Sequence, residues 1–268
     1  MSKKTTRREF VQSAGRIAAG LTGAGAMAIA VYNGEFPSSY VFAQGTARLP
    51  QPDGAGTKTD SLNPLTTCLL FFDCSNIFVN GPSLRPGDRT PMVQAAVTNW
   101  KHQQNLARQL RMMVAYANTA QRADRSNYFP RLIDRFQPAR LGDERRPMSR
   151  AVLGTPEVAV IDEIAPAQDE YMFWKDHWDP WQDTGFELAM LRRKVNTVIV
   201  NGGSTEVGIV ATAFGAHRLS HDIVFVSDGC TSNNAVAHEM LMYHRFPRMG
   251  MVRTTDQVLA MLQAGNHI

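Results

Sequence analysis

The sequence contains few cysteines. Cys68, Cys74 and Cys230 are the only three among 268 residues. An odd number of cysteines without close spacing fits neither a disulfide framework nor a metal motif. Cys68 and Cys74 lie in or beside one apolar segment, as is typical of small buried hydrophobic side chains. The cysteine pattern therefore argues against a disulfide-rich fold and against a cysteine-based metal site.

A large excess of charge of one sign is also missing. The chain has 28 Lys and Arg against 24 Asp and Glu, a net charge of +4. Residues 1–43 carry five of the basic groups and two of the acidic ones, so the rest of the chain is close to neutral. A near-neutral body without a basic stripe argues against a nucleic-acid-binding protein. With 44% apolar residues, the chain is too hydrophobic to be disordered.

Long hydrophobic runs are absent as well. The weakly apolar stretch over residues 17–31 is shorter than the roughly 20 residues of a membrane span. It follows a basic segment over residues 2–10 and precedes the small-residue processing site Val41-Phe42-Ala43. The segment Thr6–Phe10 resembles the twin-arginine signal that exports folded proteins. We therefore predict that residues 1–43 are a signal peptide, that the protein is periplasmic or otherwise exported, and that processing leaves no stable membrane span. A short N-terminal anchor or a frayed helix is the alternative.

Residues 44–64 are rich in Pro, Gly, Thr and Asp and show no hydrophobic periodicity. Such a composition is typical of a linker. Residues 65–268 are then expected to form one domain.

Short apolar runs alternate with helical patterns throughout this domain. This order is typical of a parallel sheet with helices on both faces. We therefore predict the α/β class: a three-layer α/β/α Rossmann-like domain with a mainly parallel sheet of about six strands. Residues 118–150 are expected to form an excursion over the sheet edge. The predicted strands are Cys68–Phe72, Met112–Tyr116, Tyr171–Trp174, Thr197–Val200, Ile223–Val226 and Met251–Arg253, and the predicted helices are 91–111, 186–193, 206–219, 235–243 and 255–264.

Three polar or glycine-rich features follow the predicted strands. Asp73 ends the first strand, Lys175 ends the third, and the turn at residues 202–208 follows the fourth. In open parallel sheets the ligand crevice lies beyond the carboxyl ends of the strands. These features are therefore expected to meet at one site.

Four stretches, in the same order along the chain, resemble the isochorismatase-like hydrolases. Together they span about residues 65–262, which makes the resemblance specific although each stretch alone is weak. They are Leu69–Phe78, Val152–Pro156 with Ile161–Pro166, the spacing of Lys175, Trp181 and Thr184, and Thr197–Gly208 continuing into Ala213.

The resemblance implies a role for each matching residue. It makes Asp73 the acid/base carboxylate, Lys175 its cationic partner, and the Gly203–Ser204 bond a cis peptide. It also implies a small-molecule substrate, no cofactor and a homo-oligomer. No metal is expected, because the segment that would carry a metal-binding histidine has none. The expected substrate-binding residues are Phe78, Trp181, Gly203, Ser204 and Thr205.

Gly208 departs from the family pattern, because the family places its nucleophilic cysteine there. A glycine keeps the backbone donors at a helix start but supplies no nucleophile. One outcome is non-covalent general acid/base hydrolysis of a carboxylate- or amide-bearing molecule through Asp73 and Lys175. The true isochorismatases, which also resemble this chain in having glycine there, cleave a vinyl ether in this way. The other outcome is a catalytically silent member that binds a small anionic ligand.

Three further alternatives remain open. Cys74 or Cys230 could replace the missing nucleophile, although neither is expected to face the site. A laboratory change from cysteine to glycine at position 208 would also explain the sequence. In a third interpretation the excursion over residues 118–150 binds a partner protein.

Overall fold

The computed structural model describes residues 61–124, 126–127 and 150–266. The predicted signal peptide, most of the predicted linker and most of the excursion over residues 118–150 lie outside the described residues. The end of the predicted linker belongs to the folded domain, because Leu62 is buried and its N–H donates to the carbonyl of Met261 at 2.9 Å.

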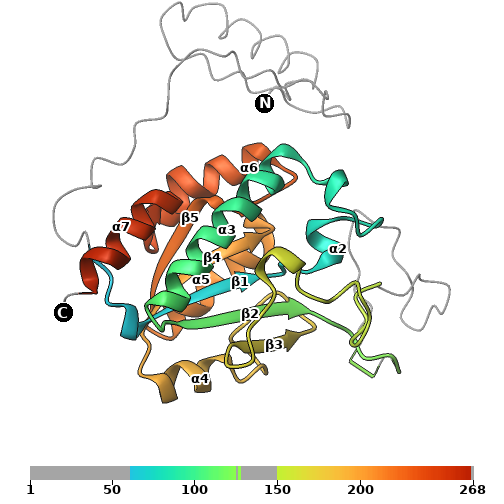
Figure 1. Ribbon diagram of the computed structural model, residues 1–268, viewed down its shortest axis with the longest axis horizontal. Coiled ribbons are helices and arrows are strands. Elements are labelled where there is room, and N and C mark those ends of the chain that lie inside the picture. The colour runs from blue at the N-terminus through green and yellow to red at the C-terminus, as the bar shows by residue number, and fades with distance from the viewer. Residues whose placement is uncertain (1–60, 125, 128–149, 267–268) are drawn as a thin grey trace, which may run out of the picture. The chain divides into compact units, whose positions relative to one another are not determined.

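A six-stranded sheet forms the centre of the domain (Figure 1). Its strand order is β3-β2-β1-β4-β5-β6, and every neighbouring pair is parallel. The predicted α/β class and strand number are therefore confirmed. The strands are β1 (Thr67–Phe72), β2 (Met113–Thr119), β3 (Tyr171–Lys175), β4 (Thr197–Gly203), β5 (Asp222–Thr231) and β6 (Met251–Arg253).

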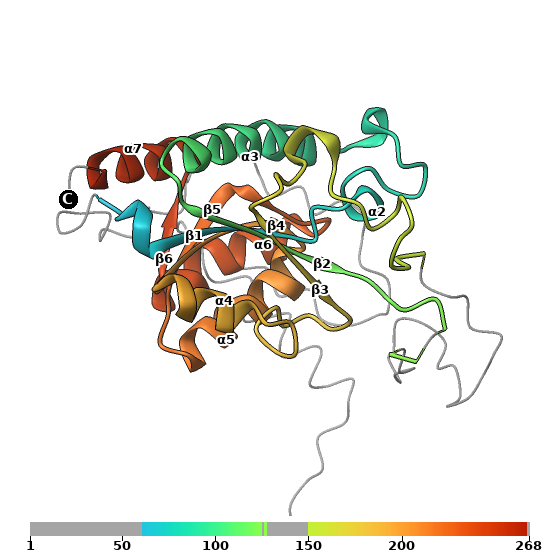
Figure 2. The ribbon, with the colours of Figure 1, turned by 60° about the horizontal axis from the view of Figure 1, so that its bottom comes forward.

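Helices cover both faces of the sheet, as Figure 2 shows. Helices α3 and α7 lie on one face, and α4 and α5 lie on the other. None of the described helices is long and apolar enough to cross a membrane. The helices are α2 (Asn76–Val79), α3 (Pro91–Gln109), α4 (Phe186–Arg193), α5 (Val210–Arg218), α6 (Ala235–Met240) and α7 (Thr255–Gly265).

Strand β1 divides its side chains between two hydrophobic cores. Leu70 and Phe72 belong to one core, and Leu69 and Phe71 belong to the other. This division follows from the pleat, because successive side chains of a strand point to opposite faces. Phe72 therefore lies on the face that α5 covers, and this placement later determines the shape of the site.

Several elements differ from the sequence prediction at their ends. Strands β2 and β4 continue to Thr119 and Gly203, three residues beyond their predicted ends at Tyr116 and Val200. Strand β5 continues to Thr231, five residues beyond the predicted end at Val226. The prediction stopped there because Ser227 and Asp228 interrupt the apolar run. The helix expected over 206–219 begins instead as a π-helical turn over Thr205–Ile209, which α5 continues.

Candidate active site

Strand register brings the ends of β1, β2 and β3 together. Phe72 at the end of β1 is paired with Ala117, and Thr119 at the end of β2 is paired with Lys175. The N–H of Asp73 still donates to the carbonyl of Ala117 at 2.9 Å, although Asp73 has a positive φ of 51° and leaves the strand. The side chains of Asp73, Thr119 and Lys175 therefore meet at one edge of the sheet.

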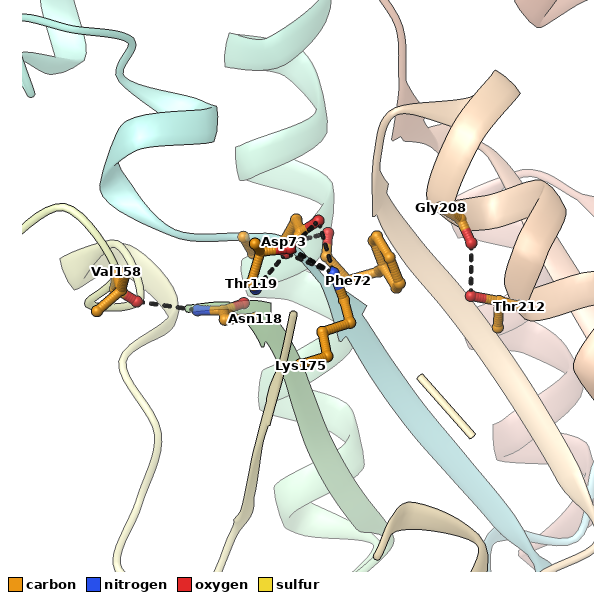
Figure 3. A network of polar contacts seen from close by, with 9 residues as sticks. Phe72, Asp73, Asn118, Thr119, Val158, Lys175, Gly208 and Thr212 are labelled. Carbon is orange, nitrogen blue, oxygen red and sulfur yellow. Dashed lines mark hydrogen bonds and ion pairs between the residues drawn. The ribbon is translucent and has the colours of Figure 1, made fainter. Parts of the chain in front are cut away.

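These three side chains form a closed polar network (Figure 3). The Lys175 ammonium donates to both carboxylate oxygens of Asp73, at 3.0 and 2.9 Å, and to the Thr119 hydroxyl at 2.6 Å. The Thr119 backbone N–H donates to Asp73 Oδ1 at 2.6 Å, and its hydroxyl donates to Oδ2 at 3.2 Å. All three donors of the ammonium are thus engaged.

The two members of this ion pair differ in burial. The side chain of Lys175 is 0% exposed, whereas that of Asp73 is 11% exposed. Burial lowers the pKa of Lys175, and the charge and hydrogen bonds of Asp73 oppose that shift. The hydrogen bonds to the Asp73 carboxylate come from the Lys175 ammonium and from the backbone N–H and hydroxyl of Thr119. These donors fix the orientation of the carboxylate at the edge of the sheet.

The Phe72 ring separates the ion pair from α5 (Figure 3). The Lys175 Nζ lies 4.0 Å from the centroid of this ring, a cation–π contact. On the other side, a Cβ atom built on Gly208 would overlap the ring edge of Phe72. The ring thus occupies the space that any side chain at position 208 would need.

The end of β4 approaches β1 closely. Gly202 has a φ of +107°, and a Cβ atom there would overlap the carbonyl oxygen of Phe72. Only glycine allows the two strands to come this near at that conformation. The following Gly203–Ser204 bond is a cis peptide, as the resemblance implies.

A cavity of about 340 Å³ opens beside these strand ends. Aromatic side chains form much of its wall, and Phe78 and Trp178 are 52% and 61% exposed. Aromatic walls combined with polar side chains that can orient a ligand are typical of a small-molecule site. The residues that line it are Phe72, Asp73, Phe78, Val79, Val93, Trp100, Thr119, Asp176, His177, Trp178, Gly203, Ser204, Val207, Gly208, Thr231, Ser232 and Asn233.

Five of the predicted site residues line this cavity, and they are Asp73, Phe78, Gly203, Ser204 and Gly208. Lys175 does not line it, but its ammonium contacts three residues that do, which are Phe72, Asp73 and Thr119.

Two predicted substrate-binding residues lie away from this cavity. Trp181 packs in the core against Phe186, and its indole N–H donates to the carbonyl of Thr212 at 3.0 Å. Its indole packs so closely against α5 that a Cβ atom on Gly215 would overlap the ring. Thr205 is fully buried, and its hydroxyl donates to the carbonyl of Thr231 at 3.0 Å and lies 2.8 Å from His238 Nδ1. Neither residue lines the cavity.

A second cavity of about 430 Å³ lies beyond the ends of β2 and β3. Asp176 and His177 border both cavities, and Lys175 borders the second although its side chain is fully buried. Among the described residues, no three His, Cys, Asp or Glu side chains are grouped so that they could hold a metal ion.

Comparison with known proteins identifies the family. Residues 67–257 match the family model of the isochorismatase domain. The match covers well over half of the chain, so the protein belongs to the isochorismatase family of hydrolases. The family relationship accords with the parallel sheet and with a cavity at its carboxyl edge.

Individual relatives are more distant. The chain is 29% identical over 123 residues to the uncharacterized isochorismatase family protein YwoC of Bacillus subtilis strain 168. That match covers 46% of this chain and 61% of the relative, so the chain spans less than two thirds of it.

Two solved structures show the same fold. An isochorismatase family protein from Burkholderia thailandensis is 22% identical, with a TM-score of 0.65 over 77% of this chain and all of that one. N-carbamoylsarcosine amidase from Thermoplasma acidophilum is 19% identical, with a TM-score of 0.54 over 71% of this chain and 97% of that one.

Thr119 and Phe72 are site residues that the sequence analysis missed. Thr119 holds the Asp73 carboxylate with two hydrogen bonds. The signal for it was the end of the second strand, which the apolar run placed three residues too early. Phe72 was treated only as a strand residue, although strict alternation along β1 would have directed its ring toward α5.

The three cysteines are expected to be unreactive in the folded protein. All three are buried, and burial raises the pKa of each thiol. Ellman's reagent should label no thiol within minutes in the native protein and three thiols per chain in 6 M guanidinium chloride. Rapid labelling of Cys74 or Cys230 in the native state would restore the alternative of a substitute nucleophile.

Gly208→Ala is expected to lower the free energy of unfolding by about 1–3 kcal/mol, because its methyl group would overlap the Phe72 ring. The cost should fall by at least about 1 kcal/mol when Phe72 is also changed to leucine, since the two sites are in contact. Urea unfolding of both single variants and the double variant measures this coupling.

Gly87→Ala is the matched control. Its Cβ atom would meet nothing within 4 Å, so a change within about 0.5 kcal/mol is expected. If the substitutions at positions 72 and 208 change the free energy of unfolding additively, the proposed contact between the Phe72 ring and residue 208 is contradicted.

Proposed function

We propose that the protein hydrolyses a small amide-bearing molecule by direct attack of water, with Asp73 as general base and without a covalent intermediate. One observation carries this proposal. The position that the resemblance assigns to the nucleophile is Gly208, and the Phe72 ring fills the space beside it. The Asp73 carboxylate, in contrast, faces the cavity and is held in place by Lys175 and Thr119.

The proton transfers balance without a nucleophile from the protein. Water attacks the carbonyl carbon while one of its protons passes to the Asp73 carboxylate. The carbon–nitrogen bond then breaks, and Asp73 returns the proton to the leaving amine. The longest bond to the carboxylate, from the Thr119 hydroxyl at 3.2 Å, is the one that the attacking water can replace.

The turn after β4 supports the same reaction. Ser204, Val207 and Gly208 line the cavity at the start of the helical segment that continues into α5. The N-terminus of a helix favours negative charge, such as that which develops on the carbonyl oxygen during attack. An amide substrate class also agrees with the likeness to the Thermoplasma acidophilum amidase.

A catalytically silent binding protein is the second candidate. The observation that favours it is the isolation of Lys175, whose side chain is fully buried and fully hydrogen-bonded. Lys175 in this arrangement does not present its charge to a ligand. A silent member would therefore bind through the aromatic wall of the cavity and not through Lys175.

Turnover of defined compounds separates the two candidates. Ammonia release is measured from a panel of small primary carboxamides and ureido acids, and pyruvate release is measured from isochorismate. Ammonia release is the expected result. Pyruvate release alone would mean that Asp73 works as a proton donor, contrary to the proposal. A rise in melting temperature with a panel compound but no product would favour the binding protein.

A further inference from the structure

The Phe72 ring lies between a buried positive charge and the cavity. The Lys175 ammonium is 4.0 Å from the ring centroid, and its side chain has no exposed surface. Phe72 lines the cavity, whereas Lys175 does not. A molecule that enters the cavity therefore contacts the Phe72 ring and not the Lys175 ammonium, which lies behind the ring.

The remaining lining residues supply no lysine or arginine side chain that could pair with an anion. The charged residues among them are Asp73 and Asp176, and the described lining residues include no lysine or arginine. The charge of Asp73 is balanced by Lys175, but that pairing uses all three hydrogen-bond donors of the ammonium. A carboxylate ligand would thus have to lose its hydration without gaining a charged partner.

Gly208 makes this arrangement possible. The edge of the Phe72 ring occupies the volume that a side chain at position 208 would fill. The ring can therefore remain over the ammonium only while residue 208 is glycine. Gly208 leaves space for the Phe72 ring, and the ring in turn covers the Lys175 ammonium.

We propose that Phe72 is a specificity-determining residue, whose ring screens the Lys175 ammonium and makes the cavity select uncharged ligands over anionic ones. The inference rests on the proposed function in that it places the ligand in the cavity beside Asp73. The inference goes beyond the proposed function because it states that the preferred ligand is uncharged and that Phe72 determines this preference. It differs from the expectation of a small anionic ligand.

Benzamide and benzoate test this proposal, because they have nearly the same size and differ in charge. Isothermal titration calorimetry gives their dissociation constants with the full chain as purified. The wild-type protein is expected to bind benzamide at least about tenfold more tightly than benzoate. In Phe72→Leu, benzoate affinity should rise about tenfold and fall again with added salt, because the ammonium becomes accessible.

Phe78→Leu is the matched control, since it makes the same chemical change in the same cavity wall but away from Lys175. It should weaken both probes similarly and give no gain for benzoate. Thermal unfolding checks that each variant is folded. If Phe72→Leu does not fold, Phe72→Met removes the ring with a smaller change in volume.

Three results would overturn the proposal. They are equal or tighter binding of benzoate by the wild-type protein, no gain for benzoate in a folded Phe72 variant, and no binding of either probe by the wild-type protein. The readout is binding and not turnover. A failure of the hydrolytic proposal would therefore appear separately, as bound benzamide without product.

Discussion

Replacing Asp73 with asparagine is expected to lower kcat by roughly 10²–10⁴-fold, the usual contribution of a general acid or base. Asparagine keeps the shape of the side chain but cannot accept the proton of the attacking water. The Thr119 N–H can still donate to the asparagine carbonyl, so substrate binding should change much less than turnover. The measurement is kcat and KM for the best substrate of the carboxamide panel.

Asp176→Asn is the control for Asp73→Asn, because Asp176 lines the same cavity outside the polar network. A change in kcat of less than about threefold is expected for it. Circular dichroism and thermal unfolding show whether each variant is folded at the assay temperature. Full turnover by a folded Asp73→Asn protein would remove Asp73 from the mechanism.

Replacing Lys175 with methionine is expected to lower the free energy of unfolding by about 3–5 kcal/mol, because it leaves a largely buried carboxylate without its partner. Methionine matches the unbranched lysine side chain as far as Cε and lacks the ammonium. The loss should therefore reflect charge pairing and hydrogen bonding more than packing. Urea unfolding followed by circular dichroism measures it.

Two further variants show whether the loss of stability in Lys175→Met comes from the ion pair. Lys101 is an exposed lysine of α3, and Lys101→Met should change the stability by no more than about 0.5 kcal/mol. The double variant Asp73→Asn/Lys175→Met should be more stable than the sum of its single variants implies, since no unpaired charge remains. A loss in Lys175→Met no larger than that in Lys101→Met would contradict the buried ion pair.

The sequence predicted the sheet well because its strands are short, apolar and buried on both faces. Thr67–Phe72 and Thr197–Gly203 are almost wholly buried, so an apolar run identified each of them. Strand β5 was predicted too short, since its second half contains Ser227 and Asp228. There the pairing with β4 shifts register between Val200 and Gly202, which no hydrophobic pattern reveals.

The polar part of the site was easier to predict than its apolar part. Asp73 and Lys175 follow strands and carry charge, so their position at the crevice followed from the topology. The contact of Phe72 with Lys175 and Gly208 depends on side-chain direction and on the register of three strands. Trp181 was misplaced for a related reason, because spacing from Lys175 does not reveal that the indole packs beneath α5.

Export remains a prediction, because the twin-arginine-like segment lies outside the described residues. We retain it as a proposal on the strength of Thr6–Phe10 and the weakly apolar stretch that follows. The predicted homo-oligomer likewise remains a prediction.

Hydrolysis of a carboxamide in the presence of hydroxylamine tests the central claim most directly. A covalent acyl-enzyme would partition between water and hydroxylamine and give a hydroxamate beside the acid. Direct attack by water, with Phe72 filling the space beside Gly208, predicts ammonia release with no hydroxamate above the uncatalysed background. Hydroxamate formation that depends on the protein would contradict the account, and so would the absence of ammonia release across the whole panel.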